Sequence, residues 1–108
     1  PILRQRDDCV LLVVGDGPSR AGLEALCQEL RVGPRVIFTG RVTPDRARIL
    51  TGLFNVAPFP RLATPVNRLV TPLKPIEAMA AGASVLLSNL PPLAELRGPG
   101  MPDLIQPG

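Results

Sequence analysis

Hydrophobic residues of this 108-residue chain alternate between two patterns. Aliphatic runs that end in glycine occupy residues 9–15 (CVLLVVG) and 35–40 (RVIFTG), and such runs are typical of strands buried on both faces of a parallel sheet. We expect a weaker strand over residues 54–60, with its end broken by Pro58 and Pro60. A fourth strand is predicted over residues 84–88, and residues 103–106 (DLIQ) are a candidate fifth.

Helical spacing separates these runs. Residues 18–33 place Leu23, Leu26, Cys27 and Leu30 on one face, with Ser19 as candidate cap and Gly33 as stop signal. The next helix begins with Thr43 as cap, Pro44 at the first helical position and Asp45 in the first turn. Residues 75–82 (PIEAMAAG) predict a short helix closed by Gly82, residues 91–96 predict a helical turn, and the Pro and Asn content of residues 61–71 predicts a loop.

This alternation predicts an α/β fold, a doubly wound parallel sheet of Rossmann-like type, formed by one domain over residues 1–108. Ligands of such folds bind beyond the carboxyl ends of the strands, where loops lead into helices. We therefore expect the site among the loops at residues 15–18, 40–43, 58–72 and 88–92.

Composition excludes several functions. The chain has three Phe and neither Trp nor Tyr, and its 12 basic residues are dispersed, which argues against a nucleic-acid surface. It contains no His, no metal-ligand spacing and no activated nucleophile, so no catalytic or metal-binding residue is predicted. With no membrane span or signal peptide, and with two cysteines, Cys9 and Cys27, that suit buried thiols, we expect a cytoplasmic protein.

Gly15 and Gly17 suggest a dinucleotide fingerprint, but Arg20 stands where the third glycine of G-x-G-x-x-G would fall. No P-loop sequence follows either. A tight strand-to-helix turn without a ligand is the simpler interpretation of these glycines.

The stretch VTPLKPIEAMAAG (residues 70–82) carries the strongest chemical signal. A helix N-terminus attracts anions, Lys74 would add a full positive charge beside a phosphate, and Glu77 in the first turn could accept hydrogen bonds from ribose hydroxyls. The alternative is that Glu77 only complements the helix dipole and that Lys74 is solvated.

The stretch PLKPIEAMAAGASVLLSNLPPLAEL, preceded by LLVVGDGP and VIFTGRV, resembles the C-terminal donor-binding domain of glycosyltransferase family 4, the group 1 glycosyl transferases of GT-B fold. The resemblance covers residues 8–96. It implies that Glu77 holds the ribose of a nucleotide-diphosphate sugar, that the backbone at Leu73 and Lys74 faces the diphosphate, and that the main chain at Arg41 and Val42 reads the base. It also implies a retaining, metal-free transfer of a hexosyl group without a cofactor.

Two positions depart from the family pattern. Leu69 stands where the family motif has its first glutamate, and Arg68 precedes it. This puts the sugar and the activity in doubt, unless Arg68 itself meets an acidic donor sugar or a phosphate.

The resemblance further implies that the acceptor-binding domain and the residues that clamp the diphosphate precede Pro1, that a closing helix follows Gly108, and that this fragment alone is inactive. Any membrane association is expected to come through the preceding domain. Two alternatives stay open: a scaffold or binding domain that kept the fold and lost catalysis, and a receiver-like α/β module, for which Asp16 alone is too little acid.

Overall fold

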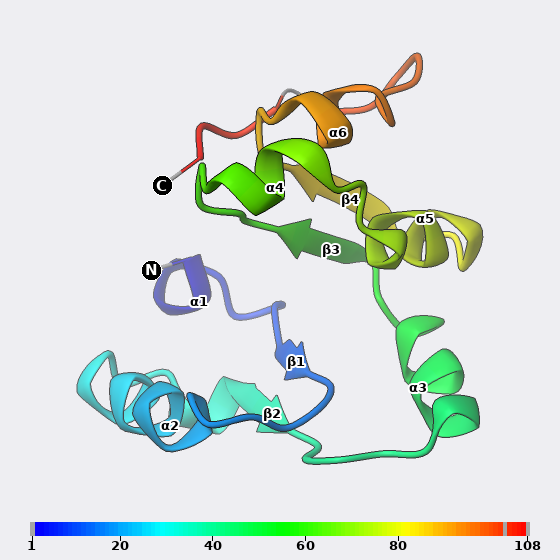
Figure 1. Ribbon diagram of the computed structural model, residues 1–108. Coiled ribbons are helices and arrows are strands. Elements are labelled where there is room, and N and C mark those ends of the chain that lie inside the picture. The colour runs from blue at the N-terminus through cyan, green and yellow to red at the C-terminus, as the bar shows by residue number, and fades with distance from the viewer. Residues whose placement is uncertain (1, 103, 108) are drawn as a thin grey trace. The chain divides into compact units, whose positions relative to one another are not determined.

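The computed structural model describes residues 2–102 and 104–107. The chain divides into two compact units, residues 1–47 and 48–108, and helix α3 (Pro44–Thr51) spans the division (Figure 1). Each unit contains one pair of parallel strands. The predicted α/β class with parallel strand pairing is confirmed, and the fold is Rossmann-like in type. The assignment of the whole chain to one domain stays a prediction.

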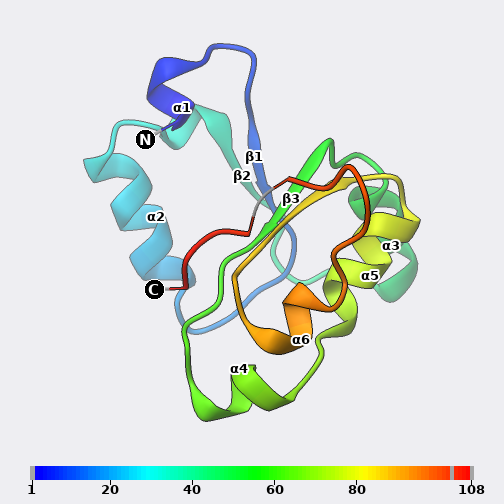
Figure 2. The same ribbon diagram turned by 90° about the horizontal axis from the view of Figure 1, so that it is seen from above.

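The first unit contains α1 (Ile2–Gln5), β1 (Leu11–Val13), α2 (Arg20–Glu29), the 3-10 helix η1 (Gly33–Arg35) and β2 (Val36–Phe38). Strands β1 and β2 pair in parallel, with Leu12 opposite Ile37. Because both strands run in one direction, the chain must cross over between the end of β1 and the start of β2, and α2 forms this crossover (Figure 2).

The second unit contains β3 (Val56–Phe59), α4 (Pro65–Leu69), α5 (Leu73–Ala80), β4 (Ser84–Leu87) and α6 (Pro91–Ala94). Strands β3 and β4 also pair in parallel, with Ala57 opposite Val85. After β4, Ser88 forms a single parallel bridge to Ile105. The expected fifth strand is therefore reduced to this bridge among the described residues, and Asp103 lies outside them.

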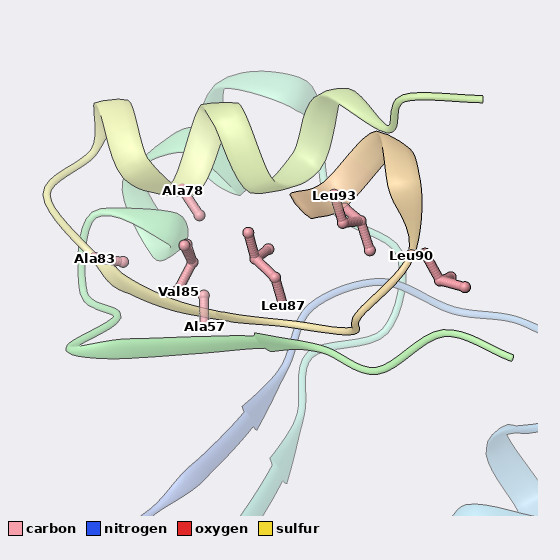
Figure 3. Packing of buried hydrophobic residues seen from close by; sticks show 7 residues of the cluster. All are labelled: Ala57, Ala78, Ala83, Val85, Leu87, Leu90 and Leu93. Carbon is pink, nitrogen blue, oxygen red and sulfur yellow. The ribbon is translucent and has the colours of Figure 1, made fainter. Parts of the chain in front are cut away.

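The buried core lies in the second unit, where α5 packs on the β3–β4 pair (Figure 3). The helix that carries Ala78 lies over the strands that carry Ala57 and Val85. Small residues on the underside of α5 let the helix approach the sheet closely. The core cluster consists of Ala57, Ala78, Ala83, Val85, Leu87, Leu90 and Leu93.

The expectation of strands buried on both faces is wrong for the described structure. Leu11 and Ile37, in the two aliphatic runs that end in glycine, are 40% and 52% exposed. Each sheet has two strands, so these positions lack the covering that the centre of a wider parallel sheet receives.

Pro58 does not end β3, which continues to Phe59 with Pro58 opposite Leu86. In a two-stranded ladder each strand has one side without a partner, so a residue that lacks an N–H group is tolerated there.

The expected signals at both ends of α2 are also corrected. Ser19 occupies the N-cap position but has helical backbone angles and makes no side-chain cap bond. The helix ends at Glu29 with Leu30 as its C-cap, and the next residue, Arg31, takes the left-handed conformation with φ 54°, while Gly33 begins η1. Leu23 and Leu26 on the predicted apolar face are 44% and 45% exposed.

Helix α4 falls inside the segment predicted as a loop. The hydroxyl of Thr64 caps it by accepting a hydrogen bond from the Asn67 N–H at 3.3 Å, and Pro65 follows at the first helical position. The same Thr-Pro signal correctly predicts the start of α3, where the Thr43 hydroxyl accepts from the Arg46 N–H. The helix was therefore predictable from its cap, and its Asn misled the interpretation.

Cys9 and Cys27 are free thiols, half-buried rather than fully buried. In the chain as described, no helix has the length and apolar character to cross a membrane.

Candidate functional site

Helix α5 begins two residues earlier than the sequence suggested. Pro72 is its N-cap, with extended backbone angles, so Leu73, Lys74 and Pro75 form its first turn. Pro75 fits there because N–H groups of a first turn have no partner within the helix, and its missing donor is no loss. The ring of Pro75 is buried, together with Ala78, which fixes the face that α5 turns to the core.

This earlier start moves Glu77 into the second turn, which corrects the expectation of a first-turn position. Favourable interaction with the helix dipole falls off within the first turn. The alternative role of Glu77, as a complement to the dipole, therefore loses much of its physical basis.

The backbone N–H groups of Leu73 and Lys74 are open at the start of α5. Pro72 has no side chain that could cap them, and no side-chain cap bond is present. The Lys74 ammonium and the Glu77 carboxylate are both exposed, and neither has a hydrogen-bond or ion-pair partner in residues 2–102 and 104–107. Two free N–H donors, one cation and, one turn further, one free carboxylate thus share one end of one helix.

Arg68 and Leu69 end α4, a short distance before α5 along the chain. The Arg68 Nε donates to the Ala63 carbonyl at 3.5 Å, and the side chain is exposed. Leu69 is 83% exposed. Neither residue is enclosed by protein, so both are accessible to a ligand.

The segment after β3 is held by polar side chains that sequence reasoning missed. Ser88, 1% exposed, accepts a hydrogen bond from the Arg61 N–H at 2.8 Å and donates to the Phe59 carbonyl at 3.4 Å. The Arg61 guanidinium donates to Asn67 Oδ1 at 3.1 Å, and Asn67 Nδ2 donates to the Leu62 carbonyl. These bonds fix the start of the segment that carries Arg68.

In the first unit, Gly15 and Gly40 form an antiparallel bridge just beyond β1 and β2. Both have positive φ, 121° and 68°, which explains glycine at these two turns. The Thr39 hydroxyl accepts from the Gly15 N–H at 3.3 Å and donates to the Gly40 carbonyl at 2.9 Å. Gly17 donates its N–H to the Asp16 carboxylate, so that donor already has a partner.

Arg41 and Val42 follow the bridged Gly40; Arg41 is exposed and Val42 half-buried. Arg20, at the position of the missing third glycine, places its guanidinium 5.8 Å from the centre of the Phe38 ring and donates to Glu24 at 2.8 Å. The bond to Glu24 raises the pKa of Arg20 above its ordinary value. A Cβ at Gly40 would meet this guanidinium at 3.0 Å.

The predicted site residues therefore form two sets. Gly15, Gly17, Arg41 and Val42 lie beyond the carboxyl ends of β1 and β2, within the first unit. Arg68, Leu73, Lys74 and Glu77 lie on α4 and α5 of the second unit, between β3 and β4. Among the residues that the structure describes, no group of three or more His, Cys, Asp or Glu could hold a metal ion.

Over residues 1–108 the chain matches the family described as "Glycosyl transferases group 1". It is 32% identical over 96 residues to an uncharacterized glycosyltransferase, MJ1607, of Methanocaldococcus jannaschii, covering 89% of this chain. It is 34% identical over 95 residues to TuaH of Bacillus subtilis, named as a teichuronic acid biosynthesis glycosyltransferase, and 31% identical over 98 residues to a 2-deoxystreptamine glucosyltransferase of Streptomyces kanamyceticus, covering 88% and 91% of this chain. The chain spans 23 to 24% of the length of these relatives. No solved structure matches it.

Proposed function

Because the chain belongs to the group 1 glycosyl transferases, we propose that it forms the donor-binding part of a glycosyltransferase that uses a nucleotide-diphosphate sugar. The observation that carries this proposal is the start of α5, where two uncapped N–H groups, Lys74 and Glu77 are all without partners in the described chain. Such a helix end is suited to a diphosphate.

Each residue has a distinct part in this proposal. The N–H groups of Leu73 and Lys74 and the Lys74 ammonium bind the diphosphate, and the carboxylate of Glu77 accepts hydrogen bonds from the two ribose hydroxyls. The main chain at Arg41 and Val42 contacts the base. Arg68 contacts the donor sugar or a phosphate.

In this proposal, transfer of the sugar is accelerated by stabilisation of the negative charge on the departing diphosphate. As the bond between sugar and diphosphate breaks, negative charge grows on the departing oxygen, and donors already in place stabilise it without reorganisation. The proposed reaction retains anomeric configuration, moves a hexosyl group and needs no metal. In this proposal, an N-terminal domain of the full-length protein binds the acceptor. Turnover requires the full-length protein, which acts in the cytoplasm.

Calorimetric titration of the full-length protein with UDP, GDP, ADP, their sugar conjugates and the parent nucleosides tests this proposal. Glu77→Gln should weaken nucleoside and nucleoside diphosphate alike by roughly tenfold, since the ribose is common to both. Lys74→Gln should weaken only the diphosphate, by about tenfold or more, because the nucleoside lacks the charge that Lys74 meets.

Glu95→Gln is the matched control, because Glu95 is an exposed glutamate in the same unit. It should leave every affinity unchanged, and Glu77→Gln should not change fold stability, since its side chain has no partner to lose. Equal donor affinity in Glu77→Gln and in the parent would refute the ribose role.

A second candidate is a scaffold or binding domain of the same fold that has lost catalysis. It is favoured by Leu69, 83% exposed at a position where a carboxylate would contact the sugar, and by the basic Arg68 before it. Absence of binding by every nucleotide tested would support this candidate over the enzyme.

A further inference from the structure

The first unit contains a cavity of about 390 Å³ that the proposed donor site does not use. Its volume lies within the range of about 300 to 1,000 Å³ that is typical of small-molecule sites. Half of its lining residues are arginines. It is lined by Leu3, Arg4, Arg31, Val32, Pro34 and Arg35.

This cavity lies at the amino ends of the strands. Its lining residues lie in α1, which precedes β1, in the turn that follows α2, and in η1, which leads into β2. Gly15, Gly17 and Arg41 follow the carboxyl ends of the same strands. The cavity is therefore separate from the loops where ligands of α/β folds bind.

Arg35 is committed to structure. Its Nη1 donates to the carbonyls of Leu3 and Arg6, and its Nη2 donates to the Asp7 carboxylate at 2.5 Å. These bonds tie α1 to η1 and form one wall of the cavity. Because Asp7 neutralises the charge of Arg35, Arg35 forms part of the cavity wall without adding net positive charge to the cavity.

Arg4 and Arg31 carry the free charge. Both are exposed, and neither guanidinium has a hydrogen-bond or ion-pair partner among the described residues. Arg31 also holds the left-handed conformation, φ 54°, that favours glycine. Strain of this kind at a residue whose side chain lines a cavity is a pointer to function.

We propose that this cavity binds a phosphate monoester, with Arg4 and Arg31 as the two guanidinium donors and Leu3, Val32 and Pro34 as an apolar wall for the attached group. Planar guanidinium groups match phosphate oxygens bidentately, and two unopposed positive charges favour a dianion. The phosphate can belong to a free metabolite or to the headgroup of an anionic lipid.

Calorimetric titration of the full-length protein with inorganic phosphate tests this site. Arg31→Gly should weaken binding by about tenfold or more through loss of a charge-assisted contact, and Arg4→Gln should do likewise. Arg31→Gly also relieves the left-handed strain, so it should melt no lower than the parent, which excludes unfolding as the cause.

Two controls separate this site from others. Arg46→Gln removes an exposed charge of the same unit outside the cavity and should change phosphate affinity by less than about twofold. Lys74→Gln, which alters the proposed donor site, should leave this phosphate binding in place, and Arg31→Gly should leave nucleotide binding unchanged.

Vesicles of phosphatidylcholine with and without phosphatidic acid distinguish the two phosphate sources. Binding of free phosphate that depends on Arg31 supports a metabolite. Binding only to the phosphatidic acid vesicles, with the same dependence on Arg31, supports a lipid headgroup. Absence of both, or equal binding by Arg31→Gly and Arg46→Gln, would overturn the proposal.

Discussion

The two strand pairs of this chain are tied at their carboxyl ends by the same device. One residue after β2, the Thr39 hydroxyl bonds to the Gly15 N–H, two residues after β1. One residue after β4, the Ser88 hydroxyl bonds to the Arg61 N–H, two residues after β3. A hydroxyl that follows the second strand thus fixes the loop after the first strand in both units.

The surroundings of these ties differ. Ser88 is 1% exposed and lies beside a cluster of seven buried residues, whereas Val32 is the only buried apolar side chain in the described part of the first unit. Helix α5 turns the small residues Pro75 and Ala78 to its sheet, while α2 leaves Leu23 and Leu26 nearly half exposed. Two strand pairs with the same kind of tie therefore receive unequal packing, and the stronger packing supports the helix that carries Lys74 and Glu77.

Truncation of a core leucine should expose this difference most. Leu87→Ala removes a side chain that is 1% exposed and should lower the stability of β4 by about 2 to 5 kcal/mol. Leu26→Ala in α2, where the side chain is 45% exposed, should lower local stability by about 1 kcal/mol or less. Amide hydrogen exchange measures the free energy of opening in each unit separately. Equal losses would contradict the unequal packing inferred here.

Alternation of apolar runs and helical spacing was sufficient to predict the class, since parallel pairing requires a crossover and the runs at residues 9–15 and 35–40 are separated by a helix. Burial was not predictable, because exposure of Leu11 and Ile37 depends on what covers the sheet and not on the run itself.

Local chemistry explains the other errors. Pro75 is compatible with the first helical position and equally with the third, where it stands, and this difference of two residues moves Glu77 from the first turn into the second. Lys74 and Glu77 were found from their chemistry as site candidates. The roles of Ser88 and Asn67 were not predicted. Both side chains bond to Arg61, which lies 27 positions before Ser88 and 6 before Asn67, and no local sequence pattern indicates such pairs.

Removal of either hydroxyl should weaken the tie that it forms, by different amounts in the two units. Ser88→Ala should cost about 1 to 3 kcal/mol, because the Arg61 N–H then loses the hydroxyl of a residue that is 1% exposed, where water cannot easily replace it. Thr39→Val keeps the shape of a half-buried side chain, and water can replace the hydroxyl at Gly15, so the cost should be about 1 kcal/mol or less. Exchange rates of the Arg61 and Gly15 amides report each tie directly. If Thr39→Val lost more stability than Ser88→Ala, the tie in the first unit would be the stronger one, which contradicts this prediction.

The smallest expected effect concerns the two helix ends. Helices α2 and α5 both close with a Schellman motif: the Val32 and Ala83 N–H groups bond to the Cys27 and Ala78 carbonyls at 2.9 and 3.0 Å.

The left-handed position between them holds Arg31, φ 54°, in α2 and Gly82, φ 90°, in α5. An L side chain there costs about 1 kcal/mol relative to glycine. Arg31→Gly should therefore stabilise the end of α2 by up to about 1 kcal/mol, and Gly82→Ala should destabilise the end of α5 by about the same amount, as read from amide exchange at Val32 and Ala83. If Arg31→Gly brought no gain, the Arg31 side chain would have to make stabilising contacts that offset its strain, and the left-handed conformation would no longer point to a ligand.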